Sequence, residues 1–229
     1  MKESTRVLIL VVLYSVGLIS IYVPALKPWC LPLTPLNLLI SFLFLLQAYQ
    51  WEKQLVLSAL YVFILGMAAE WIGVHTGWLF GSYHYASHLG LKAGGVPLII
   101  GVNWAMLTLL AAGVSTALSK NKGLRILFGA LLMTAMDYFM EPVAINHQFW
   151  IWDNGKIPLF NYVSWFFVSL LTQWVVFKRK DVPLNNTALA LFILINLFFT
   201  VQFFVYVLVG TFRFTSYFFW NGIHGMVHP

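Results

Sequence analysis

The sequence predicts an all-α polytopic membrane protein, a bundle of about seven transmembrane helices that forms a single transmembrane domain over residues 1–229. Of its 229 residues, 61% are hydrophobic and 9% are charged, and the mean hydropathy is +0.84. So few polar residues cannot cover a water-soluble globule. Several apolar runs also approach the length of about 20 residues that a helix needs to cross a bilayer.

The expected spans follow one another with short connections. They lie at roughly 7–26, 34–50, 55–74, 97–118, 124–141, 159–177 and 187–210. The first resembles a secretory signal peptide because Lys2 and Arg6 precede it, but its apolar run is long, so we interpret it as a retained span. Pro142 is expected to end the fifth helix, because proline removes a helical hydrogen bond.

The distribution of lysine and arginine predicts the orientation. The N-terminus and the loops near residues 51–54, 119–125 and 178–185 hold nine of these residues, and the opposite side holds four. This bias predicts a cytoplasmic N-terminus and a C-terminus outside, in a multi-pass protein of the cell membrane. The basic residues behind the net charge of +6 lie in these short loops, where they set the orientation of the protein. We therefore expect the lipid bilayer as a partner, and no nucleic acid.

Two segments of similar design, 70–103 and 137–162, carry the polar residues of interest. Each begins with a carboxylate near the end of an apolar helix, continues as an aromatic loop, and re-enters the membrane at a proline, Pro97 or Pro158. The predicted topology places both loops on the non-cytoplasmic side. We therefore interpret the two segments as the walls of one site at that membrane face.

The carboxylates lie within or at the ends of predicted spans. Asp137 and Glu141 are four residues apart and share one helix face. Glu70 lies about four residues before the end of its helix, and Asn103 projects an amide from the next one. A charge at the centre of a span costs roughly 2.5–3.5 kcal/mol, and such residues normally face a protein interior with partners. The sequence thus predicts an acid-bearing pocket that opens into the lipid.

The order of these motifs resembles the membrane carotenoid-biosynthesis hydratase family, of the γ-carotene 1'-hydroxylase and bisanhydrobacterioruberin hydratase type. The similarity covers roughly residues 60–170 and depends on the combination of several short motifs. They are Glu70-x2-Gly73-x3-Gly77, Phe80-Gly81-x-Tyr83-x-Tyr85, Gly95-Val96-Pro97 with Trp104, Asp137-x3-Glu141-Pro142, Trp150-x-Trp152 and Pro158-x2-Asn161-Tyr162.

The resemblance implies an enzyme, a carotenoid 1,2-hydratase. Such an enzyme adds water across the terminal C-1/C-2 double bond of an acyclic carotenoid end group and gives a tertiary 1-hydroxy carotenoid. The reaction is expected to need no cofactor. It also implies a lipophilic polyene substrate and, as further partners, other enzymes of the carotenoid pathway. Hydration of an alkene needs a strong positioned acid. A carboxyl group can serve if it stays protonated, which burial or a neighbouring carboxylate favours. We assign this role to Asp137, with Glu70 or Glu141 holding its proton or deprotonating water.

Aromatic side chains are the main candidates for substrate binding. An aromatic face can stabilise a cation by roughly 0.5–2 kcal/mol, although Trp and Tyr also belt the interfaces of most membrane proteins. The candidates in the two loops are Trp71, Trp78, Phe80, Tyr83, Tyr85, Trp150 and Trp152. Asn103 is a polar candidate, and the resemblance adds Trp104 and Asn161.

Two other functions remain open. The spacings His84-x3-His88 and His224-x3-His228, with Glu70 and Asp137 nearby, could ligate zinc or iron, as in a metal-dependent membrane lipid hydrolase or hydroxylase. The first pair lies in a loop between two glycines, and too few histidines are present for a di-iron hydroxylase, so the principal prediction includes no metal. The other alternative is a non-catalytic carotenoid-binding membrane protein.

Overall fold

A computed structural model describes residues 1–224 of the protein, and its side chains through residue 206. This part of the chain contains seven helices that are long and apolar enough to cross a membrane, which confirms the predicted all-α bundle. They are α1 (Glu3–Tyr22), α3 (Thr34–Ala48), α4 (Lys53–Thr76), α5 (Leu98–Leu118), α6 (Lys122–Asn146), α7 (Leu159–Arg179) and α8 (Asn186–His224). A short helix α2 (Lys27–Cys30) and a 3-10 turn η1 (Leu31–Leu33) lead into α3 and extend its apolar span.

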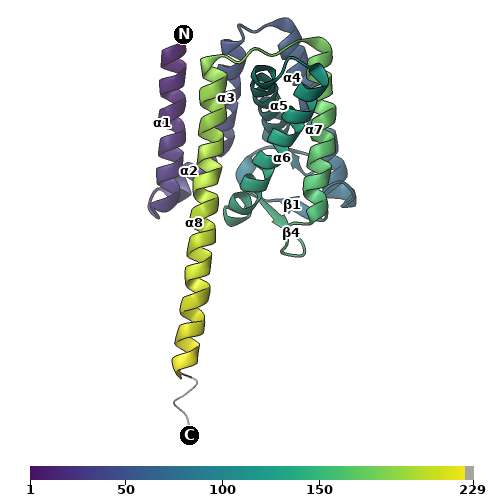
Figure 1. The fold of residues 1–229 in the computed structure, drawn as a ribbon. Helices are drawn as coiled ribbons and strands as arrows, with labels where there is room; N and C mark the ends of the chain where they lie inside the picture. The colour runs from purple at the N-terminus through teal and green to yellow at the C-terminus, as the bar shows by residue number, and fades with distance from the viewer. Residues whose placement is uncertain (225–229) are drawn as a thin grey trace.

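Helix α5 lies at the centre of the fold, with α4, α6 and α7 around it, while α1, α3 and α8 pack along one side (Figure 1). Most side chains of α5 are buried, as expected of a helix that is apolar on all sides. Helices α1 and α8 contact each other through Tyr14 and Phe198, whose ring centroids are 6.0 Å apart. The outer helices leave many large apolar side chains exposed on the surface that lipid would cover.

The helix boundaries agree with the prediction at the prolines that open helices. Helix α5 begins directly after Pro97, and α7 begins directly after Pro158. The prediction that Pro142 ends the fifth helix was wrong, because α6 continues through it to Asn146. Proline removes one backbone donor, but Val143 and Ala144 in the following turn are buried, so packing supports the extra turn. Helix α8 likewise continues beyond residue 210 to His224.

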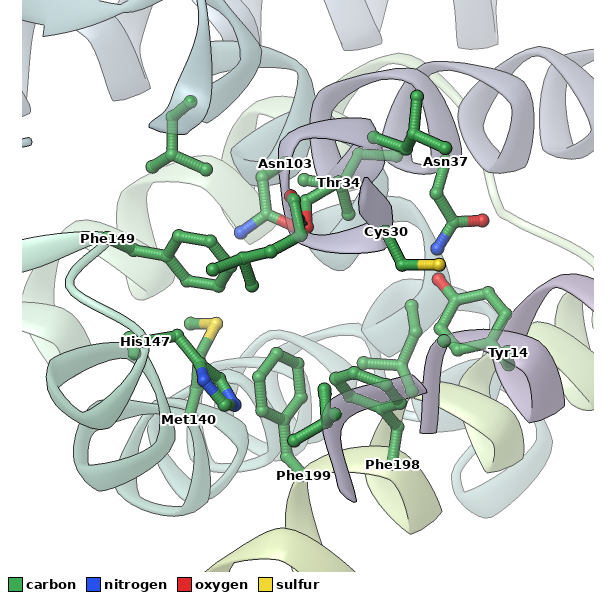
Figure 2. A pocket seen from close by; sticks show the side chains of 18 of the residues that line it. Tyr14, Cys30, Thr34, Asn37, Asn103, Met140, His147, Phe149, Phe198 and Phe199 are labelled. Atoms are coloured by element: carbon green, nitrogen blue, oxygen red, sulfur yellow. Dashed lines mark hydrogen bonds between the residues drawn. The ribbon is translucent and has the colours of Figure 1, made fainter. Parts of the chain in front are cut away.

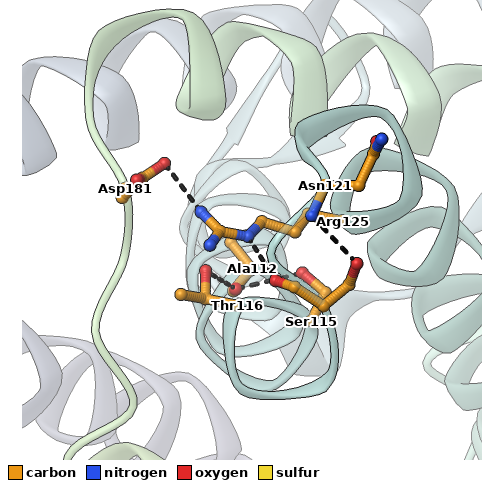
Figure 3. A network of polar contacts seen from close by, with 7 residues as sticks. Ala112, Ser115, Thr116, Asn121, Arg125 and Asp181 are labelled. Atoms are coloured by element: carbon orange, nitrogen blue, oxygen red, sulfur yellow. Dashed lines mark hydrogen bonds and ion pairs between the residues drawn. The ribbon is translucent and has the colours of Figure 1, made fainter.

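One end of the bundle carries the N-terminus and the loops between α3 and α4, α5 and α6, and α7 and α8 (Figure 1). Polar contacts join these segments. Arg125 forms an ion pair with Asp181 at 3.0 Å and donates a hydrogen bond to the Ser119 carbonyl oxygen at 2.6 Å (Figure 3), and Asn186 donates to Glu3 at 3.2 Å. The nine basic residues counted above therefore gather at one end. Which side of the membrane this end faces stays a prediction.

At the opposite end, the two aromatic loops pair with each other. Strand β1 (Tyr83–Tyr85) runs antiparallel to β4 (Trp150–Trp152), with Tyr83 opposite Trp152 and Tyr85 opposite Trp150. The first loop also contains the 3-10 turn η2 (Ser87–Leu89) and a small hairpin of β2 (Lys92–Ala93) and β3 (Val96–Pro97). Strands were not predicted here, although the alternation in Tyr-His-Tyr and Trp-Ile-Trp is a signal for them.

Candidate active site

Glu70 lies near the end of α4, where three donors bind its carboxyl group. Its Oε2 accepts hydrogen bonds from the hydroxyls of Tyr83 and of Tyr85, the latter at 2.7 Å, and its Oε1 accepts from Trp104 Nε1 at 2.9 Å. Gly77 caps the helix at a φ of 68°, a left-handed conformation that glycine adopts readily. The chain can therefore reverse there and bring β1 back over Glu70.

Glu141 and Asp137 lie one turn apart on α6, and both contact Asn161 of α7. Glu141 Oε2 accepts from Trp150 Nε1 at 3.0 Å and from Trp152 Nε1 at 2.9 Å. The Asn161 amide nitrogen donates to Asp137 Oδ2 at 2.9 Å and to Glu141 Oε1 at 3.4 Å. The other oxygen of Asp137, Oδ1, is buried and has no hydrogen-bond partner among the described residues.

The two tyrosines of β1 are proton donors to Glu70. Burial, and next the negative charge of Glu70, raise the pKa of Tyr83 well above its ordinary value. The same two causes raise the pKa of Tyr85. Both phenols therefore keep their protons across the physiological range. The ion pairs found among the described side chains lie elsewhere, so the three acids are held by neutral donors.

The three acids line one small cavity of about 30 Å³. Eleven of the candidates named from the sequence surround it: Glu70, Phe80, Tyr83, Tyr85, Asn103, Trp104, Asp137, Glu141, Trp150, Trp152 and Asn161. The volume suffices for a water molecule, which needs roughly 10–15 Å³.

Three further residues of the lining were not among the candidates: Ile100, Met140 and Trp165. Their spacing from candidate residues on the same helices could have identified them. Ile100 precedes Trp104 by four residues, Met140 follows Asp137 by three, and Trp165 follows Asn161 by four, and such spacings put side chains on one helix face.

Trp71 and Trp78 do not reach this cavity. Their side chains are 49% and 79% exposed, and the Trp71 ring stacks on His75 with centroids 4.6 Å apart. Trp71 follows Glu70 by one residue, which rotates its side chain by about 100° around the helix. Of these neighbouring residues of α4, only Glu70 therefore lines the acid cavity, and a role of Trp71 and Trp78 in substrate binding stays a prediction.

The spacing His84-x3-His88 of the metal alternative does not form a common helix face. His84 lies on β1 and contacts Asp153 at 3.1 Å, whereas His88 lies in η2. Among the side chains that the structure describes, no three of His, Cys, Asp or Glu lie close enough together to hold a metal ion. The side chain of His224 and all of His228 lie outside the described residues.

A second, larger cavity adjoins the acid cavity. It has a volume of about 190 Å³ and lies among α1, α3, α5, α6 and α8 (Figure 2). The two cavities share four lining residues, Ile100, Asn103, Met140 and Trp150. Most other residues of the larger lining are aliphatic or aromatic. Val16 and Leu33 in its lining are 51% and 54% exposed, so the cavity reaches the lipid-covered surface.

The fold and the site define a multi-pass membrane protein with buried carboxyl groups beside an apolar cavity. The chain matches the family described as carotenoid biosynthesis protein over residues 32–223 and belongs to this family. This finding confirms the family that the motifs indicated.

A bisanhydrobacterioruberin hydratase of Haloarcula japonica is 30% identical over 168 residues, which cover 64% of this chain and 57% of that protein. The match therefore spans little more than half of the relative. No solved structure matches the chain.

A close approach of two helices supports the site. At Gly66 of α4, an added Cβ would lie 2.6–2.8 Å from three atoms of Trp104. Trp104 stacks on Trp165, with centroids 4.0 Å apart, and donates to Glu70, so it cannot move freely. We expect Gly66→Ala to destabilise the protein by about 1–3 kcal/mol, the usual cost of overpacking, and thermal unfolding in detergent measures this.

Gly113→Ala is the matched control for this substitution. An added Cβ at Gly113 of α5 would have its nearest neighbour, Tyr49 Oη, at 3.4 Å, which is ordinary contact. Because alanine favours a helix over glycine, this variant should unfold at or above the temperature of the unaltered protein. An equal response to both substitutions would contradict the tight contact at Trp104.

Proposed function

We propose that the protein is a carotenoid hydratase that adds water across the terminal C-1/C-2 double bond of an acyclic carotenoid end group by acid catalysis. Family membership and the hydratase relative support carotenoid chemistry. The observation that carries the proposal is the buried Oδ1 of Asp137, which has no hydrogen-bond partner in the described part of the chain and belongs to a cavity that adjoins a large apolar one. An acid is thus held beside a space suited to a hydrocarbon chain.

Asp137 is the proton donor in this proposal. Burying an ionised carboxylate is costly unless its oxygens are hydrogen-bonded or paired with a cation. Among the side chains that the structure describes, Glu70 and Glu141 each accept hydrogen bonds from three, whereas Asp137 accepts from one. Its environment therefore does least to support an anion, and its free oxygen is the one that can carry a proton into the cavity.

The reaction is the balanced addition of one water molecule. The proton of Asp137 bonds to C-2 with the electrons of the double bond, which leaves a tertiary cation at C-1. The oxygen of a water molecule then bonds to C-1, and its extra proton passes to Glu141 or Glu70 and returns to Asp137. Asn161 donates hydrogen bonds to both Asp137 and Glu141 and so holds the two carboxyl groups in a fixed arrangement.

The polyene enters laterally from the bilayer. In this proposal its chain occupies the apolar cavity, and its end passes Ile100, Asn103, Met140 and Trp150 to reach the acids. An extended carotenoid is comparable in length to the hydrocarbon thickness of about 30 Å. The stacked rings of Trp104 and Trp165 offer aromatic surface, which attracts cations, to the developing charge at C-1.

The setting of the reaction follows from the predicted orientation. The protein resides in the cell membrane with the acid cavity toward the outer surface, where water is available. Its partners are the carotenoid substrate, the lipid bilayer and other enzymes of the carotenoid pathway, which supply the polyene.

Incubation of membranes with an acyclic-ended carotenoid in isotopically labelled water tests the proposal. We expect the product to gain the mass of one water and to carry the label in a hydroxyl group, with or without molecular oxygen. An oxygen atom derived from molecular oxygen would indicate a hydroxylase instead. A polyene that stays bound but unchanged in mass would indicate a non-catalytic carotenoid-binding protein.

A further inference from the structure

We propose that His147 forms a hydroxyl-binding subsite in the apolar cavity, so that the protein binds a hydroxylated end of an acyclic polyene more tightly than an end without a hydroxyl group. The inference rests on the proposed function, because it takes the polyene as the occupant of this cavity. It adds a residue that distinguishes a hydroxylated polyene end from an end without a hydroxyl group.

His147 lies directly after α6 and is 3% exposed. Its ring lines the apolar cavity (Figure 2). His147 Nε2 lies 2.7 Å from Gln202 Oε1, and Gln202 Nε2 donates to the Phe198 carbonyl oxygen at 3.2 Å. Because this second bond fixes the orientation of the Gln202 amide, His147 Nε2 carries the proton. Nδ1 is then a hydrogen-bond acceptor, and it has no partner among the described residues.

The imidazole stays neutral in this position. Burial lowers the pKa of His147 below its ordinary value, and the charge of Lys27 acts in the same direction, against the hydrogen bond with Gln202. Nδ1 therefore keeps its lone pair at neutral pH. A buried acceptor without a donor is costly, and a ligand that supplies a donor removes that cost.

The remaining lining limits what such a ligand can be. Phe149 and Phe199 lie near His147 in the cavity, and Phe198 lies farther along it near Tyr14 (Figure 2), so an apolar chain fits along most of the cavity. A pure hydrocarbon would leave Nδ1 of His147 without a donor. A hydroxyl group is the hydrogen-bond donor that suits an otherwise apolar isoprenoid chain.

Competitive binding tests the subsite without relying on turnover. The full-length protein carrying Asp137→Asn is purified in detergent with equal amounts of lycopene and its 1-hydroxy derivative, and the retained pigments are separated and quantified. We expect roughly tenfold preference for the hydroxylated pigment, the effect of one hydrogen bond to a buried acceptor. His147→Phe should reduce the preference to about one, whereas His147→Asn, which keeps an acceptor near Nδ1, should retain part of it.

The control is His75→Phe, because His75 is exposed on α4 and does not line the cavity; it should leave the preference unchanged. Equal retention of both pigments by the parent protein, or a preference that survives His147→Phe, would overturn the proposal. If His147→Phe unfolds, His147→Leu serves as the apolar variant. A preference that depends on His147 in a protein that adds no water would remove the proposed function but leave the subsite.

Discussion

Asp137→Asn should lower the rate of water addition by roughly 10²–10⁴-fold, the usual contribution of a general acid. An amide cannot donate an acidic proton to carbon. Its oxygen can still accept the hydrogen bond that Asp137 receives from Asn161, so we expect the variant to fold and to retain the polyene. Product mass measures the loss, and the bound pigment in the same sample reports the intact site.

Asp153→Asn provides the matched control. Asp153 is an exposed carboxylate at the same end of the bundle, pairs with His84 at 3.1 Å, and does not line the acid cavity. Its replacement should leave hydration unchanged. If Asp137→Asn instead hydrates the substrate as fast as Asp153→Asn, Asp137 is not the proton donor.

Glu70→Gln should produce the second large effect, a loss of activity of about 10²-fold or more together with a loss of stability of about 1–3 kcal/mol. Trp104 Nε1 is only a donor, so the glutamine oxygen must face it. The amide nitrogen then faces the hydroxyls of Tyr83 and Tyr85, which now donate to Glu70. Both phenols lose their acceptor, and the site loses a carboxyl group that exchanges protons. Product formation and thermal unfolding measure the two effects.

Tyr85→Phe separates the structural part of this effect from the chemical part. It removes one donor to Glu70 but leaves the carboxyl group and the donors Tyr83 and Trp104. We expect a comparable loss of stability with a decrease in activity of only a few fold. If Glu70→Gln is no less active than Tyr85→Phe, Glu70 anchors β1 and takes no part in proton transfer.

The fold was largely predictable from the sequence, because membrane spans need long apolar runs and Pro97 and Pro158 mark two helix starts. The error at Pro142 has a physical cause. A proline rule counts the lost backbone donor, but the burial of Val143 and Ala144 depends on neighbouring helices that local sequence does not reveal. The pairing of β1 with β4 likewise joins loops far apart in the chain.

The candidate site was predictable in part. The four-residue spacing of Asp137 and Glu141 places them on one helix face, but no spacing relates either residue to Glu70 on another helix. Trp104 and Asn161 entered the list through the family resemblance alone. The contact between His147 and Gln202 joins the end of α6 to α8, and the apolar cavity lies among five helices. The sequence of a single helix specifies neither feature.

The antiparallel contact between β1 and β4 also bears on how the enzyme is made. Glu70, Tyr83, Tyr85 and Trp104 all emerge from the ribosome before the second loop exists. A nascent chain that has inserted only as far as α5 contains Glu70 and its three donors, but it lacks Asp137 and the two tryptophans of β4 that pair opposite Tyr83 and Tyr85. Under the proposed mechanism, a polypeptide that ends before α6 lacks the proton donor, so we expect incomplete translation products to leave the polyene unchanged.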